Sequence, residues 1–278
     1  MALIEKLRSA QKKTGSMLCV GLDPDLDKLP PKMVAAFDGR LQPMFYEYLT
    51  RVIRMTAPHA CAFKPNMAFY EALGPNGISV LETICALIKN EHPDHVLIVD
   101  GKRGDIGNSA EKYAAALKNL GADAVTVNPY LGPGTLKPFL DAGLGIIALC
   151  VTSNTDAAAF QGLICDGKPV YRHVAEILTK EYGSTGNLGL VTGATHPKEL
   201  GEIRKAVGDE VVLLIPGIGK QEGNLEATVH NNGHGLAVIN VSSNICHASS
   251  GDDYAMAAGS AAEAYNQQIN NLRALPKE

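Results

Sequence analysis

Residues 99–106 place two carboxylates around one lysine at the end of an apolar run. Side chains two apart in a strand point to the same face, so we expect Asp100 and Lys102 to share one site. Asp105 comes after the strand should have ended, so we expect it to reach another surface, such as that of another subunit. A lysine held beside a carboxylate is suited to proton delivery and to stabilising developing negative charge.

These residues need a scaffold, and the chain alternates apolar, β-branched runs with stretches of helical composition. The runs predict eight strands, at residues 17–22, 60–64, 95–100, 123–128, 145–151, 187–191, 211–215 and 236–241. Helical patterns lie between them, as at 109–120, 171–182 and 197–207. We expect Asn108 or Ser109 to cap the first of these helices.

Apolar strands separated by helices indicate parallel pairing with both faces buried. We therefore predict an α/β fold, a (β/α)8 TIM barrel, as a single domain over residues 1–278. An open doubly wound sheet is the alternative, but it would require a Gly-rich loop after its first strand, where Asp23-Pro24-Asp25 stands. Two long connections, at about 24–42 and 154–169, are expected to shape the active site or to be tolerated surface insertions.

The composition favours a small-molecule substrate. The chain has 278 residues, 46% of them hydrophobic and 19% charged, with a net charge of -4. Nucleic acid and anionic membranes favour basic surfaces, so we expect neither as a partner. Residues 1–15 lack the apolar core of a secretory signal, and the expected location is the cytoplasm.

The cysteines and histidines show no metal-binding pattern. No C-x-x-C occurs, and Cys19, Cys61, Cys150 and Cys246 lie in apolar runs, so we expect buried free thiols and no metal site. His230 and His234 have helical spacing, but flanking glycines favour a surface turn.

Polar residues recur where the predicted strands end, which is where barrel enzymes place their chemistry. They are Asp23, Lys64, Asp100, Lys102, Asn128, and the segments 152–154, 216–223 and 240–244. We expect Lys64 to face Asp100 and Lys102 across the barrel mouth, either as part of a reactive group or as a structural salt-bridge network. The loops after the last two strands are the usual phosphate position of this fold, and Gly217 and Gly219 would let backbone amides approach an anion.

Five motifs in this order resemble the orotidine 5'-phosphate decarboxylase family, specifically its longer bacterial group. The motifs are residues 18–24, 63–66, 100–108, 152–154 and 216–219, spread over nearly the whole chain. The resemblance implies a homodimeric barrel that converts orotidine 5'-monophosphate to UMP and CO2 without a metal or organic cofactor.

The resemblance also implies roles for individual residues. Lys102 would donate a proton to C6 of the pyrimidine, and Asp100 would lie beside the scissile carboxylate. Lys64 would join Asp100 and Lys102 in an array of alternating charges. The implied substrate contacts are Asp23 and Lys64 on the ribose, Ser153 on the pyrimidine, and Gly217, Gln221, Ser243 and Asn244 around the phosphate end. Asp105, Ile106 and Ser109 would reach into the partner's site.

One departure concerns the phosphate. The family normally has an arginine after the eighth strand, and that position is Ser243 here. Lys220, where the family more often has a small residue, is a candidate replacement charge. Two alternatives follow: a metal-dependent sugar-phosphate decarboxylase or aldolase of the same superfamily, and a catalytically impaired nucleotide-binding homologue. Lys64 argues against the first, because it occupies the place of a metal-binding carboxylate.

Overall fold

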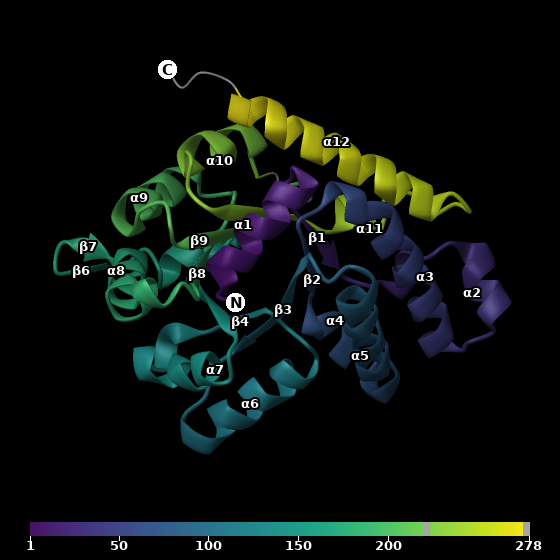
Figure 1. The fold of residues 1–278 in the computed structure, drawn as a ribbon, viewed down its shortest axis with the longest axis horizontal. Helices are drawn as coiled ribbons and strands as arrows, with labels where there is room; N and C mark the ends of the chain where they lie inside the picture. Colours follow the sequence, from purple (N-terminus) through teal and green to yellow (C-terminus); the bar gives the residue numbers. More distant parts are fainter. Residues whose placement is uncertain (220–222, 275–278) are drawn as a thin grey trace.

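The fold is a closed barrel of eight parallel strands with helices around it (Figure 1). The computed structural model describes residues 1–219 and 223–274. The strands are β1 (Leu18–Leu22), β2 (Ala62–Pro65), β3 (Val96–Arg103), β4 (Ala124–Val127), β5 (Gly145–Val151), β8 (Leu188–Thr192), β9 (Val212–Ile215) and β10 (Ala237–Val241). Because β1 pairs with both β2 and β10, the sheet closes, and the barrel prediction is confirmed over the open sheet.

One helix precedes the first strand, and the others lie between or after the barrel strands, as parallel pairing requires. The helices are α1 (Leu3–Thr14), α2 (Pro31–Phe37), α3 (Leu41–Thr56), α4 (Met67–Glu71), α5 (Gly74–Glu91), α6 (Gly107–Asn119), α7 (Lys137–Asp141), α8 (Val170–Tyr182), α9 (Pro197–Val207), α10 (Leu225–Asn232), α11 (Ser243–Cys246) and α12 (Tyr254–Ala274). In the described ranges, no helix is both long and apolar enough to cross a membrane.

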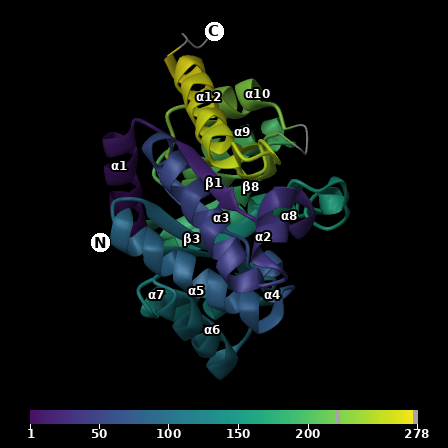
Figure 2. The same cartoon turned by 90° about the vertical axis from the view of Figure 1, so that its right-hand side faces the viewer.

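The first helix closes the amino-terminal end of the barrel. Leu3, Leu7 and Ala10 of α1 are buried in one cluster with inward-facing strand residues such as Ile98 and Val238. Burying these apolar side chains stabilises the barrel floor and leaves the opposite end open for polar groups. In the side view of Figure 2, α1 lies at one end of the barrel and the teal segment between β5 and α8 lies at the other.

Both long connections contain regular structure. Residues 24–42 include a short 3₁₀ helix, η1 (Leu26–Lys28), and α2. Residues 154–169 include η5 (Thr155–Ala159) and a small hairpin of β6 (Ile164–Cys165) and β7 (Lys168–Pro169). Both connections follow strands at their carboxyl ends, where they can shape a site.

Other details test the sequence analysis. The predicted cap of α6 is wrong: the helix begins at Gly107, and Ile106 is its N-cap without a side-chain hydrogen bond. Cys19, Cys61, Cys150 and Cys246 are free and buried, as expected. The helix α10 ends at Asn232, so it carries His230 but not His234.

Candidate active site

A cavity of about 540 Å³ opens at the carboxyl ends of the strands. It brings together seven of the predicted residues: Asp23, Lys64, Asp100, Lys102, Ser153, Gly217 and Ser243. Convergence of residues from β1 to β10 at this end is the arrangement that barrel enzymes use for catalysis. This cavity is therefore the candidate active site.

Asp100 lies between two lysines in this cavity. Its Oδ2 is 2.7 Å from Lys64 Nζ, and its Oδ1 is 2.7 Å from Lys102 Nζ. The side chain of Lys64 is only 5% exposed, whereas that of Lys102 is 49% exposed. Lys64 and Asp100 form a buried ion pair, and Lys102 extends from it with its ammonium group toward the cavity.

Burial and charge act in opposite directions on this pair. Burial favours the neutral form of Asp100, but the positive charges of Lys64 and Lys102 outweigh it and hold the pKa of Asp100 well below its usual range. Burial also favours neutral Lys64, but Asp100 and Asp23 outweigh it and raise the pKa of Lys64. Both groups are therefore charged at neutral pH.

An irregularity in β3 positions Lys102. The residue has a φ of 47°, in the left-handed region, and the pairing with β4 shifts between Val99 and Arg103. Its backbone N–H donates to Thr126 Oγ1 at 2.9 Å, and Thr126 Oγ1 donates to Asp100 Oδ1 at 2.7 Å. Thr126 is a site residue that the sequence analysis missed, because a threonine in an apolar strand is typical of β structure.

Asp23 lines the cavity directly after β1, the strand that pairs with β2. Its Oδ2 accepts a hydrogen bond from Ser242 Oγ, while its Oδ1 is buried without a partner. Asn240 Oδ1 is likewise buried without a partner. Buried polar atoms seldom remain unpaired, so these two oxygens mark where a ligand or water can donate hydrogen bonds. Ser242 and Asn240 both belong to the polar segment 240–244 predicted at the end of the last strand, but the sequence predicts no individual role for either.

The predicted phosphate end is only partly described. Gly217 and Gly219 have φ values of 105° and 90°, a conformation that glycine adopts readily. Ser243 lines the cavity, but Asn244 does not; its Nδ2 donates to Tyr265 Oη at 3.0 Å. The predicted residues Lys220 and Gln221 lie outside the described residues.

Three predicted residues lie away from the cavity. Asp105, Ile106 and Ser109 are not among its lining residues: Asp105 and Ile106 lie between β3 and α6, and Ser109 lies in the first turn of α6. Ile106 is 65% exposed, and Ser109 is also exposed.

The donors in this cavity do not form a typical metal site. Over residues 1–219 and 223–274, no three His, Cys, Asp or Glu side chains are grouped to hold a metal ion. The ammonium of Lys64 occupies the position beside Asp100 that a cation would need. Hard cations require clustered oxygen ligands, which this arrangement does not offer.

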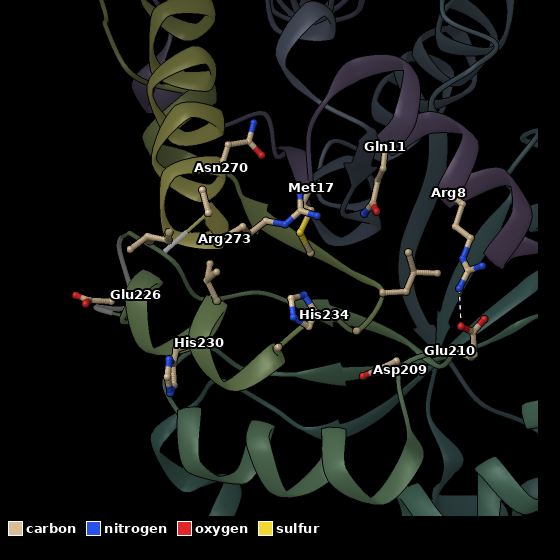
Figure 3. A pocket seen from close by; sticks show the side chains of 16 residues that line it. Arg8, Gln11, Met17, Asp209, Glu210, Glu226, His230, His234, Asn270 and Arg273 are labelled. Carbon is tan, nitrogen blue, oxygen red and sulfur yellow. Dashed lines mark hydrogen bonds and ion pairs between the residues drawn. The ribbon is translucent and has the colours of Figure 1, made fainter. Parts of the chain in front are cut away.

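A larger hollow, of about 920 Å³, lies at the amino-terminal side between α1, α10 and α12 (Figure 3). An ion pair of 2.5 Å between Arg8 and Glu210 lies at its edge. Its lining includes His230 and His234 but none of the predicted site residues. Seven of the predicted site residues line the smaller cavity instead.

The closed barrel, with charged residues at the carboxyl ends of its strands, has the architecture of a TIM-barrel enzyme. The model of the orotidine 5'-phosphate decarboxylase / HUMPS family matches residues 16–266, and the chain belongs to this family.

Individual relatives support this assignment. The chain is 40% identical to an orotidine 5'-phosphate decarboxylase of Bordetella pertussis, covering 98% of this chain and 100% of the relative. It is 42% identical to the protein of that name from a Janthinobacterium species, covering 97% and 98%. The solved structure of Leishmania donovani OMP decarboxylase matches with a TM-score of 0.81 and 32% identity, covering 99% and 100%.

Proposed function

We propose that this chain decarboxylates orotidine 5'-monophosphate to UMP and CO2 in pyrimidine biosynthesis, with Lys102 as the proton donor to C6. The observation that carries this proposal is the contact of Lys102 with buried Asp100 in a chain of the decarboxylase family. The reaction takes place in the cytoplasm and uses neither a metal ion nor an organic cofactor.

The geometry supports a two-part chemical step. The bond between C6 and the carboxylate breaks, CO2 leaves, and the electron pair stays on C6, which delocalises it poorly. The ammonium of Lys102 stabilises this negative charge and then transfers a proton from Nζ to C6. The half-exposed side chain of Lys102 can regain a proton from water.

Asp100 keeps Lys102 charged and in place. It also brings a negative charge near the substrate carboxylate, which disfavours the ground state by repulsion. A crystal structure of Asp100→Asn tests this second role. If turnover falls only because Lys102 has become disordered, repulsion has no part in the mechanism.

The other cavity residues bind the substrate. Asp23 and Lys64 contact the ribose, and the unpaired Oδ1 of Asp23 is an available acceptor for a hydroxyl group. Ser153 contacts the pyrimidine. Gly217, Ser243 and Asn244 bind the phosphate, although Asn244 would have to leave its bond to Tyr265 to take part. Gln221, outside the described residues, is proposed to bind the phosphate as well.

The active form is a homodimer in which Asp105, Ile106 and Ser109 reach the partner's cavity. Exposure of Ile106, Tyr130 and Leu131, at 65%, 87% and 51%, supports this proposal because exposed apolar side chains favour an interface. Sedimentation of the wild-type chain and of Ile106→Glu tests it. A monomeric wild type with full activity would contradict the proposal.

An absorbance assay with orotidine 5'-monophosphate and the purified chain separates the candidate functions. The decarboxylase consumes the substrate and retains its activity in EDTA. A metal-dependent relative would lose activity in EDTA. A nucleotide-binding homologue with impaired catalysis, suggested by Ser243, would bind UMP with negligible turnover.

A further inference from the structure

We propose that Lys28 supplies the positive charge that binds the substrate's phosphate group. This inference rests on the proposed function, because it assumes a phosphorylated substrate. Lys28 lines the same cavity as Lys102, Asp23 and Ser243. The sequence analysis did not assign it a role.

The charge balance of the cavity requires another cation. A phosphate monoester carries between one and two negative charges at pH 7, in addition to the substrate's carboxylate. Lys64 and Lys102 both pair with Asp100 at the β2–β3 side. Among the lining residues that the structure describes, Lys28 is the remaining lysine or arginine.

Lys28 lies on the side of the barrel where the phosphate is expected. It ends η1, the short helix after β1, and β1 pairs with β10 through Val20 and Val241. The loops after the last two strands of such barrels are the usual phosphate position. The hydrogen bond from Ser242 to Asp23 ties the β10 turn to the start of the connection that carries Lys28.

The nearby histidine does not provide this charge. His247 Nε2 lies 3.0 Å from the backbone oxygen of Asp23, which can only accept, so Nε2 carries the proton of that bond. Its Nδ1 lies 3.0 Å from the Tyr48 hydroxyl. Burial lowers the pKa of His247, and the charge of Lys28 lowers it further, whereas Asp23 and Asp25 oppose the shift. His247 is therefore mainly neutral at pH 7 and positions the backbone of Asp23.

Lys28 forms an ion pair with Asp25. Its ammonium pairs with Asp25 Oδ2, and the two side chains are 38% and 29% exposed. Partly exposed pairs of this kind contribute little to stability, so the pair can open at low cost. A phosphate offers a higher charge and three acceptor oxygens, which makes it the stronger partner for the ammonium group.

Calorimetric titration with UMP and with uridine tests this role, because uridine lacks only the phosphate. For Lys28→Met we expect the dissociation constant of UMP to rise by about tenfold and that of uridine to stay within about twofold. Lys28→Arg keeps the charge and should bind UMP nearly as the wild type does. Asp25→Asn removes the competing carboxylate and should bind UMP equally well or more tightly.

Lys32→Met is the matched control. Lys32 also pairs with a carboxylate, Asp252, but its side chain is 81% exposed and it does not line the cavity. It should leave both dissociation constants unchanged. Thermal unfolding of each variant verifies that it is folded.

The inference is overturned if Lys28→Met leaves UMP binding unchanged or weakens UMP and uridine equally. It is also overturned if Asp25→Asn weakens UMP binding as much as Lys28→Met does, because the ion pair would then be structural. Turnover of orotidine 5'-monophosphate by the wild type is measured in parallel. Absence of turnover contradicts the proposed function. Normal turnover together with one of the overturning titration results contradicts only the role of Lys28.

Discussion

Thr126 and Asp100 are joined by a hydrogen bond in which Thr126 Oγ1 donates to Asp100 Oδ1 across 2.7 Å. The same carboxylate oxygen contacts Lys102 Nζ, and the same hydroxyl accepts from the backbone N–H of Lys102. One threonine thus holds both the carboxylate and the backbone of the lysine beside it.

Replacing this hydroxyl should weaken catalysis. Thr126→Val keeps the shape of the side chain but leaves the Lys102 N–H without its acceptor and Asp100 with one hydrogen bond fewer. We expect kcat to fall by roughly tenfold with little change in KM, because the two hydrogen bonds are lost and a tenfold change corresponds to about 1.4 kcal/mol. Steady-state kinetics on the variant measures both constants.

Thr192→Val is its control. Thr192 is also a fully buried threonine at a strand end, but its Oγ1 has no hydrogen-bond partner. Its replacement should leave kcat unchanged and leave the protein equally stable or more stable. Equal losses of kcat in the two variants would show that Thr126 has no special role.

Lys64 and Lys102 should differ in how much each contributes to the free energy of unfolding. Lys64→Met removes a buried partner of Asp100, and we expect the free energy of unfolding to fall by about 3 kcal/mol. Lys102 is half exposed, so Lys102→Met should cost less than about 1 kcal/mol. Denaturant titration of both variants provides the comparison; the reverse order would contradict the geometry of this group.

The contribution of Asp100 and Lys64 to the stability of the fold should not depend on pH near neutrality. The pKa of Asp100 is lowered on folding, so its contribution is complete above the usual aspartate pKa of about 3.9 and is lost as the pH falls toward the folded value. The pKa of Lys64 is raised, so its contribution is complete below the usual lysine pKa of about 10.4. It is lost only as the pH rises through the higher folded value.

Thermal unfolding measures this pH dependence. The difference in Tm between the wild type and the double variant Lys64→Met/Asp100→Asn should stay constant from about pH 5 to about pH 9 and change below about pH 4. A marked change in this difference between pH 6 and pH 8 would mean that another group controls the pair.

The serine at position 243 should limit phosphate binding. A charge-assisted hydrogen bond contributes about 1.5–3 kcal/mol, so Ser243→Arg should raise kcat/KM by roughly ten- to a hundredfold if the phosphate lacks a full set of partners. Lys220→Ala should lower kcat/KM if Lys220 supplies a replacement charge. No gain in the first variant and a large loss in the second would show that Lys220 compensates fully.

Much of the fold was predictable because the strand pattern is strong. All eight barrel strands overlap their predicted ranges, since apolar β-branched runs between helices leave few other arrangements. Local details were less predictable. The strand β3 continues to Arg103 through the left-handed residue Lys102, and α6 begins at Gly107 without a side-chain cap. The contact of the Lys102 backbone with Thr126 holds the first of these, and no local sequence pattern contains it.

The site was predictable where charge is conspicuous. Lys64, Asp100 and Lys102 stand out in an apolar context, and the barrel brings them into contact. Thr126 lies in an apolar strand, where nothing in the sequence distinguishes it from a packing residue, and Asn240 stands out only as part of the polar segment 240–244. Their role depends on which face of the strand meets the cavity, and only the structure shows it.

Turnover by Lys102→Met most directly tests the claim that Lys102 delivers the proton to C6. Wild type and variant are compared by the loss of absorbance of orotidine 5'-monophosphate, and UMP titration verifies that the variant still binds nucleotide. We expect kcat to fall by at least about a hundredfold while the protein stays folded and binds UMP. A variant that releases CO2 at a rate near that of the wild type would contradict the account.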